Sequence, residues 1–306
     1  MNRLVAIVGP TGVGKSRLAL RLAQDFDGEI VSADSRQVYR HMDIGTAKPG
    51  WQELSLAPHH LIDIINPDED FSLAQYQQLA CRAIADIQQR NKLALLVGGS
   101  GLYVWAVLEG WVVPQVPPDL EFRRSLREKA ARSGAGELYQ ELMKVDPVAA
   151  QRIDPRNVRR VIRALEVHRH AQAPFSQLQR KEAPSFEALV TGLTADRAEL
   201  YRRIDSRVDE MMEQGLVEEV RKLVNMGYEF NLPAMSGIGY KQVGMFLRGE
   251  LTLESAIQQI KSETHRFVRH QYGWFRLGDN RIRWFDIEGE AEAEIRAQVA
   301  MFTGGS

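Results

Sequence analysis

The sequence predicts an α/β fold in which a parallel sheet, covered by helices on both faces, carries a helical insertion. Short apolar runs typical of strands alternate with segments of helical periodicity over the first third of the chain. A proline-rich stretch at 112–119 then leads into a segment with helical periodicity only, after which one strand-like run returns. We therefore expect a nucleotide-binding type of core over 1–112 and 188–306, and the insertion at 113–187.

Each expected element rests on its own pattern. Strands are expected where short apolar runs rich in strand formers occur, at 4–8, 29–33, 93–97 and 188–193. Helices are expected where apolar residues recur at helical spacing, at 15–26, at 73–89 and throughout 120–170. A further helix should begin after Asp196, a plausible N-cap that Glu199 follows three residues later.

Composition excludes several classes of protein. Among 306 residues, 39 Lys and Arg balance 40 Asp and Glu, so any nucleic-acid site must come from local clustering of basic residues. The single cysteine, Cys81, rules out a disulfide framework or a multi-cysteine zinc site within the chain. The amino-terminal apolar run is too short for a signal peptide, and no stretch approaches the length of a membrane span. We expect a soluble, cytoplasmic protein with no membrane partner.

Residues 9–16, GPTGVGKS, match the phosphate-binding pattern G-x-x-x-x-G-K-[ST] between an expected strand and an expected helix. Glycines allow successive amides to turn toward a phosphate, and the start of the helix directs its positive dipole end at the anion. Lys15 would neutralise the terminal phosphate, and the Ser16 hydroxyl would bind Mg²⁺. The predicted P-loop comprises Gly9, Pro10, Thr11, Gly12, Val13, Gly14, Lys15 and Ser16.

The reaction is less directly indicated. Hydrolytic P-loop proteins usually carry a magnesium-binding Asp after a second strand, but here the run at 93–97 continues into GGSGLY. This absence favours transfer to a second substrate, with a kinase-like reaction still open. Asp34 follows the run at 29–33, so it should lie at the carboxyl edge of the sheet, where ligands bind. From the pattern alone, Asp34 is equally a general base and a loop-capping residue.

The insertion contains a basic helical segment. Asp154 is the expected N-cap and Pro155 the first helical residue, and the arginines that follow recur every three to four positions. Few acidic residues interrupt the stretch. One-sided basic charge of this kind suits binding of a phosphate backbone, although a solvated helix face is equally compatible. The arginines are Arg152, Arg156, Arg159, Arg160 and Arg163.

Taken together, these motifs resemble those of one family, the tRNA dimethylallyltransferases, also called tRNA isopentenyltransferases. The resemblance extends over nearly the whole chain. Its most specific part is the string SADSRQVYRHMDIGTAKP at 32–49. Further matching strings are GPTGVGKS at 9–16, PHHLIDI at 58–64, LVGGSGLY at 96–103, VDP at 145–147, RVIRALEV at 160–167, GIGYKQ at 237–242 and the WFR that ends at Arg276.

The resemblance implies a reaction. Dimethylallyl diphosphate would be the donor, and the exocyclic amine of the adenosine 3′-adjacent to the anticodon of a tRNA would be the acceptor. The P-loop would hold the diphosphate leaving group with Mg²⁺, and Thr11 matches a family threonine near it. Arg207, in RIDSRVDEM, is a further candidate for contact with the diphosphate. Asp34 matches the family's general base. The expected partners are the tRNA anticodon stem-loop and dimethylallyl diphosphate, with no obligate protein partner.

The resemblance also implies which residues bind tRNA. They are Asp34, Ser35, Arg36, Gln37, Ser100, Arg123, Arg159, Arg160, Arg163, Gly237, Ile238, Gly239, Tyr240, Lys241 and Gln242. Ser100 stands where the family usually has Thr. Other departures are Arg36, in place of a small or apolar residue, His41, where Gly is common, and His265 and His270, at positions that are often basic.

Three other functions are compatible with parts of the sequence. An adenylate isopentenyltransferase would prenylate a free nucleotide, but the arginine-bearing insertion is not needed for so small an acceptor. A P-loop small-molecule kinase would consume ATP without RNA. A non-enzymatic RNA-binding protein with a relict loop would have no need of the intact Lys15–Ser16 pair.

Overall fold

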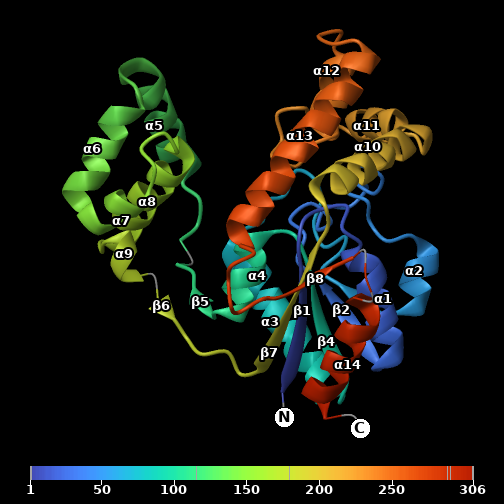
Figure 1. Cartoon of the computed structure of the whole chain (residues 1–306). Coiled ribbons are helices and arrows are strands. Elements are labelled where there is room, and N and C mark those ends of the chain that lie inside the picture. The colour runs from blue at the N-terminus through green and yellow to red at the C-terminus, as the bar shows by residue number, and fades with distance from the viewer. Residues whose placement is uncertain (1, 115, 179, 288, 290, 305–306) are drawn as a thin grey trace. The chain divides into compact units, whose positions relative to one another are not determined.

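The computed structural model of the protein describes residues 2–114, 116–178, 180–287, 289 and 291–304. Contacts within the chain divide it into two compact units, one of Met1–Leu108 with Pro184–Ser306 and the other of Glu109–Ala183. Figure 1 shows the course of the chain through both. Gln115, which belongs to the predicted proline-rich border, lies outside the described residues.

The larger unit is built on a six-stranded sheet of order β3-β2-β4-β1-β7-β8, in which every pairing is parallel. The four strands expected from the sequence are present within one residue of their predicted bounds, because buried parallel strands are continuous apolar runs. Two short edge strands carry polar residues and give no such signal. The strands are β1 (Arg3–Val8), β2 (Gly28–Ser32), β3 (His59–His60), β4 (Leu93–Gly98), β7 (Glu187–Thr194) and β8 (Arg283–Asp286).

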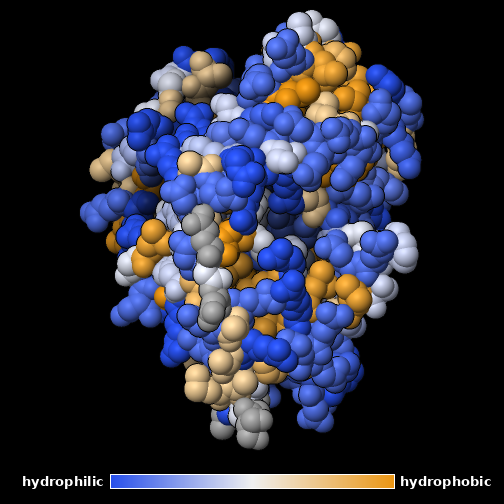
Figure 2. Space-filling model, turned by 45° about the vertical axis from the view of Figure 1, so that its right-hand side comes forward, coloured by the Kyte–Doolittle hydropathy of each residue, from blue (hydrophilic) through white to orange (hydrophobic). Residues whose placement is uncertain are grey.

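Helices cover both faces of this sheet, which confirms the predicted α/β architecture (Figure 1). On one face, α1 (Lys15–Asp25) and α14 (Ala291–Thr303) pack against alternate residues of β1 and β4. On the other lie α3 (Leu73–Gln89) and α4 (Gly101–Leu108), whereas the short α2 (Trp51–Leu56) lies beside α1. The face of the molecule in Figure 2 is mostly hydrophilic, and its hydrophobic residues form separate patches.

Further helices stand at the carboxyl end of the sheet (Figure 1). They enclose a second apolar core together with Val38, Tyr39 and Met42 from the loop after β2. Asp196 caps the first of them as predicted, but Glu199 pairs with Arg202 and Arg203 instead of returning to the cap. The elements are α10 (Arg197–Glu213), α11 (Leu216–Asn225), the 3₁₀ turn η1 (Ala234–Ser236), α12 (Tyr240–Leu247) and α13 (Leu253–Trp274).

The smaller unit is helical and has its own apolar core. It extends over 109–183, whereas the sequence predicts 113–187, because a two-stranded ribbon and the Glu182 N–H bond to Gly110 O (2.8 Å) join its ends. Its elements are β5 (Trp111–Val112), α5 (Leu120–Ser133), α6 (Ala135–Val145), α7 (Pro147–Arg152), α8 (Val158–Ala171), α9 (Phe175–Leu178) and β6 (Arg180–Lys181). Across the described ranges of both units, no helix has the length and apolar character to cross a bilayer.

The expected start of the arginine-bearing helix is wrong. Helix α8 begins at Val158, and Asn157 caps it by accepting a hydrogen bond from the Arg160 amide at 3.1 Å. Asp154 instead closes a turn by accepting from the Arg156 amide at 2.9 Å. Asp154 and Asn157 both have side chains suited to capping. Because Asp154 is used in the turn that follows α7, Asn157 becomes the cap of α8.

Candidate active site

The candidate active site lies at the carboxyl edge of the sheet. The neighbouring strands β1, β2 and β4 end there, and the loops that follow them begin side by side. Strand β4 pairs with both β1 and β2, so residues 99–100 lie between the P-loop and the loop that carries Asp34. This order separates a phosphate-binding side from a carboxylate-bearing side. Helices α10, α12 and α13 supply further side chains to the same edge.

The P-loop has the backbone that its glycines predict. Gly9, Gly12 and Gly14 have φ values of 139°, 82° and 95°, which side chains rarely allow. A Cβ on Gly9 would also lie 2.4 Å from the Leu193 carbonyl oxygen of the neighbouring strand β7. Val13 is buried, so its side chain anchors the turn to the core. The loop is therefore preformed against the sheet.

Two cations and one carboxylate interact at this edge. Burial lowers the pKa of Lys15 to about 7, with the Asp34 carboxylate opposing that effect and Arg207 adding to it. Burial likewise lowers the pKa of Arg207, and Asp34 again opposes. Lys15 Nζ donates to Pro10 O at 2.7 Å, while Arg207 has no hydrogen bond or ion pair within the described residues. An anion bound here would relieve the mutual repulsion of the two cations.

The contacts of Asp34 show the loop-capping role and are compatible with the role of a general base. Its Oδ1 accepts a hydrogen bond from the Arg36 amide at 2.8 Å and so closes a turn. Its Oδ2 has no hydrogen-bond partner among the residues described. One oxygen therefore holds the loop and the other is available to accept a proton.

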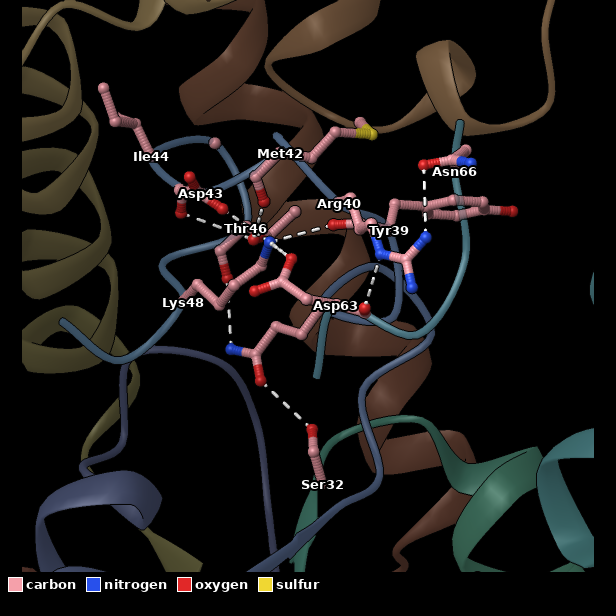
Figure 3. A network of polar contacts seen from close by, with 12 residues as sticks. Ser32, Tyr39, Arg40, Met42, Asp43, Ile44, Thr46, Lys48, Asp63 and Asn66 are labelled. Carbon is pink, nitrogen blue, oxygen red and sulfur yellow. Dashed lines mark hydrogen bonds and ion pairs between the residues drawn. The ribbon is translucent and has the colours of Figure 1, made fainter. Parts of the chain in front are cut away.

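Beyond Asp34, a polar network centred on Lys48 fixes the loop (Figure 3). Lys48 Nζ donates to Tyr39 O at 2.8 Å, to Asp43 Oδ1 at 2.5 Å and to Asp63 Oδ1 at 2.6 Å. Its side chain is only 5% exposed, so these bonds are shielded from water. Much of the string at 32–49 therefore serves the internal contacts of one loop.

Two of the predicted tRNA-binding side chains in this loop make internal contacts. The Gln37 amide accepts from Ser32 Oγ at 3.1 Å and donates to the carbonyl oxygens of residues 46 and 47. Arg36 Nη1 donates to Pro233 O at 2.9 Å. These two side chains therefore hold the loop in place, and Arg36 also reaches the segment before GIGYKQ.

The GIGYKQ segment is tied to the same loop through Glu219 of α11. The Glu219 carboxylate accepts from the amides of residues 43, 44 and 45 at 2.9, 2.8 and 3.2 Å, and from Tyr240 Oη at 2.6 Å. Burial and Glu219 together hold the pKa of Tyr240 well above its ordinary value. Gln242 is also buried and accepts from Gly239 N at 3.0 Å. Within the segment, Lys241 is the exposed side chain, Ile238 is half-buried, and Gly237 is buried.

Ser100 braces the residue after Asp34. Its Oγ accepts from the Ser35 amide at 3.1 Å and donates to Ser35 Oγ at 3.3 Å. On the other side of the same loop, Gln271 of α13 contacts both Thr11 and Gly99. Sequence motifs did not indicate Gln271, although one signal was present. It is a polar residue on the apolar stripe that includes Ile260, Val268 and Phe275.

The arginines of the smaller unit are not all uncompensated, which corrects the expectation of scarce acidic charge. Glu166 of α8 is fully buried and accepts from Arg123 Nε and Nη2 at 2.7 and 2.8 Å and from Arg163 Nη1 at 2.5 Å. Burial alone would raise the pKa of Glu166, but the two guanidinium groups outweigh it and lower that pKa. Arg159 and Arg160 are exposed and have no hydrogen bond or ion pair from their side chains in the described part of the unit.

The structure also accounts for the departures from the family pattern. His41 has φ 66°, a left-handed conformation that favours Gly, which explains why Gly is common there. His265 stacks on Tyr201 with ring centroids 4.0 Å apart, and its Nε2 lies 2.9 Å from Asp205 Oδ1. His270 is exposed. None of these three residues belongs to the P-loop, and His41 lies in the same loop after β2 as Asp34.

Comparison with known proteins places the chain in a family. A family model described as IPP transferase matches residues 37–278. The tRNA dimethylallyltransferase of Roseiflexus castenholzii is 54% identical over 300 residues, 97% of this chain and 98% of that protein. The tRNA dimethylallyltransferase of Dehalococcoides mccartyi is 51% identical over 292 residues, 95% of this chain and 90% of that one.

Solved structures agree with these relatives. The full-length tRNA isopentenylpyrophosphate transferase of Bacillus halodurans is 40% identical, with a TM-score of 0.73 over 99% of this chain and 97% of that chain. A eukaryotic dimethylallyltransferase acting on tRNA is 27% identical, with a TM-score of 0.84 over 100% of this chain and 81% of that chain. The resemblance seen in the sequence motifs is confirmed, and the chain belongs to the IPP transferase family.

Proposed function

We propose that this chain transfers a dimethylallyl group from dimethylallyl diphosphate to the exocyclic amine of the adenosine 3′-adjacent to the anticodon in tRNA. The observation that carries the proposal is the meeting of Lys15, Arg207 and Asp34 at one edge of the sheet. Two cations suit a diphosphate, and a carboxylate with a free oxygen suits an amine that must lose a proton. The names of relatives that match nearly the whole chain support the same reaction.

The P-loop side would bind the donor. As the bond between the allylic carbon and the diphosphate oxygen breaks, negative charge grows on the leaving group, and the loop amides, Lys15 and Arg207 would stabilise it. The amine nitrogen forms the new bond to the allylic carbon, and its proton passes to Oδ2 of Asp34. The Thr11 amide is bonded to Gln271, so we assign the contact of Thr11 with the diphosphate to its hydroxyl.

Ser16 fits a magnesium ion that is held mainly by the donor. Its side chain is exposed in the first turn of α1 and has no hydrogen-bond partner in the described ranges, which also contain no group of three His, Cys, Asp or Glu residues able to hold a metal. Mg²⁺ commonly takes one or two protein ligands when phosphates and water supply the others. When bound, the ion would add positive charge beside the departing diphosphate.

The acceptor side would bind the anticodon stem-loop. The target adenine must leave the base stack to reach Asp34, at a cost of a few kcal/mol, so phosphate contacts elsewhere have to stabilise the opened loop. We assign such contacts to Arg159, Arg160 and Lys241, which are exposed. Arg123 and Arg163 would act by fixing α8 through Glu166.

Incubation of the protein with anticodon stem-loop RNA, dimethylallyl diphosphate and Mg²⁺ tests the proposal. Mass spectrometry of the digested RNA should detect an adenosine heavier by one five-carbon unit. Parallel reactions with AMP as acceptor, and with ATP in place of the donor, separate the nucleotide prenyltransferase and kinase alternatives. Prenylated AMP with unmodified RNA, or ATP consumption without RNA, would contradict the proposed reaction.

Replacement of a free arginine on α8 should weaken tRNA binding through electrostatics. Arg160→Ala is expected to lower affinity and to reduce the slope of log K against log salt by about one phosphate contact. Binding titrations over a range of salt concentrations measure this slope. Arg82→Ala is the matched control, because Arg82 of α3 is also exposed and lacks a side-chain partner in the described residues. Equal slopes for both variants would show that the arginines of α8 form a solvated helix face and do not contact RNA phosphates.

A further inference from the structure

Gln271 lies beneath the candidate active site and joins two of its loops. The residue is only 4% exposed. Its Oε1 accepts a hydrogen bond from the Thr11 amide at 2.9 Å, and its Nε2 donates to Gly99 O at 3.0 Å. A backbone amide can only donate and a carbonyl can only accept, so these partners fix the orientation of the side-chain amide. Helix α13 thereby connects the P-loop with the loop after β4.

The loop after β4 is shaped to admit this side chain. A Cβ on Gly99 would lie 2.1 Å from Gln271 Nε2, so a larger residue at that position would displace the Gln271 amide from its bond to Gly99 O. The next residue of the helix extends the attachment, because Tyr272 Oη and Thr194 Oγ1 are 2.9 Å apart. The end of α13 is thus bonded to the ends of β1, β4 and β7.

From Gly99 the connection continues to the base. Ser100 is the neighbour of Gly99, and its hydroxyl accepts from the amide of Ser35, the residue after Asp34. The path from the P-loop to Asp34 therefore consists of two short hydrogen-bonded links through residues 99 and 100. Loss of the first link would leave the part-buried Thr11 amide and the buried Gly99 carbonyl without these partners, which is costly.

We propose that Gln271 is a positioning residue that sets the separation between the diphosphate on the P-loop and the carboxylate of Asp34. Attack on the allylic carbon requires donor and amine in near-contact alignment, and a misplacement of about 1 Å can cost about 10²-fold in rate. Gln271 is buried under both loops and acts through Thr11 and Gly99. The inference rests on the proposed function, because the separation matters only when both groups act in one reaction.

Gln271→Met tests the inference, because methionine has a similar length and removes both hydrogen bonds. We expect kcat to fall by roughly 10- to 100-fold, with much smaller changes in the KM for dimethylallyl diphosphate and in the Kd for tRNA. Gln88→Met is the matched control: Gln88 Nε2 donates to Arg3 O at 3.0 Å, a helix-to-β1 bond at the opposite end of that strand. Its kcat should equal that of the unaltered protein.

Gln271→Glu gives a second measurement, the pH dependence of kcat, which a change in packing alone would not alter. The ionised carboxylate still accepts from Thr11 N but cannot donate to Gly99 O, whereas the protonated carboxyl can do both. The deficit in kcat relative to the unaltered protein should therefore shrink as the pH is lowered. The same ratio for Gln271→Met, which introduces no titrating group, should not change in this way.

Two failures are distinguishable in the same assay. If folded Gln271→Met retains full kcat, or loses no more than Gln88→Met, Gln271 does not position the loops. A deficit of Gln271→Glu that is independent of pH would contradict the inference in the same way. If the unaltered protein itself produces no prenylated adenosine, the proposed function falls, and the role given to Gln271 falls with it.

Discussion

Asp34→Asn is expected to reduce turnover by about 10²-fold or more while tRNA binding stays nearly unchanged. Asparagine retains a side-chain oxygen that accepts from the Arg36 amide, now 2.8 Å from Asp34 Oδ1, so the turn should survive. It cannot take up the proton of the adenosine amine. Single-turnover rates with saturating donor, together with equilibrium tRNA binding, measure the two effects separately.

Asp34→Ala is the companion variant, because it removes the turn contact as well as the carboxylate. If loss of the base dominates, the two variants should be similarly slow. Full turnover by Asp34→Asn combined with a slow Asp34→Ala would mean that the carboxylate serves only the turn. That outcome would remove Asp34 from the proton transfer and would favour the loop-capping role that the sequence left equally open.

The parts of the fold that the sequence predicts are those with strong local patterns. Strand β1 is five fully buried apolar residues in succession from Leu4, and α1 carries a clear apolar stripe through Leu18 and Leu22. Strand β8 is not indicated, because Arg283–Asp286 has two aromatic residues between two charged ones, and its extended conformation depends on pairing with β7. The start of α8 was misplaced for a local reason, since Asp154 and Asn157 are equally suitable caps.

The candidate site divides in the same way. Consecutive residues form the P-loop, and Asp34 directly follows a strand, so one motif and one strand end locate both. Gln271 bonds to Thr11, 260 positions away, and Glu219 bonds to the loop after β2 from more than 170 positions away. No local pattern encodes such partners. The sequence indicates only that a polar residue stands on an apolar face, and the tertiary structure determines what it binds.

The same limit applies to the basic helix. The spacing of Arg159, Arg160 and Arg163 correctly predicts a shared region of one helix, but it does not reveal which charges are free. Glu166 lies on the buried side of α8 and binds Arg163 together with Arg123 from α5. A count of charges therefore overstates the number of arginines available to RNA, and the structure narrows the electrostatic test to Arg159 and Arg160.

Binding of the diphosphate should depend on the protonation of Lys15. Burial holds the pKa of Lys15 at about 7 in the free protein, and a bound polyanion would raise it by favouring the ammonium form. Below pH 7 the amine is already charged, so affinity for magnesium pyrophosphate should be insensitive to this group. Above pH 7 binding must take up a proton, and affinity should weaken by about tenfold per pH unit until the pKa of the complex is reached. Calorimetric titrations in buffers of different ionisation enthalpy measure both the affinity and the proton uptake.

Two variants isolate this effect from the ionisation of pyrophosphate itself, which is common to all the titrations. Lys15→Arg keeps a charge that does not titrate, so the ratio of its affinity to that of the unaltered protein should rise with pH above 7. Lys15→Met removes the charge and should reduce turnover by roughly 10²- to 10³-fold, as for the loss of one donor to a developing anion. A ratio between the unaltered protein and Lys15→Arg that stays constant across pH would show that Lys15 is already fully charged at the sheet edge. The predicted coupling of diphosphate binding to proton uptake would then be wrong. Normal turnover by Lys15→Met would separately show that Lys15 does not stabilise the leaving group.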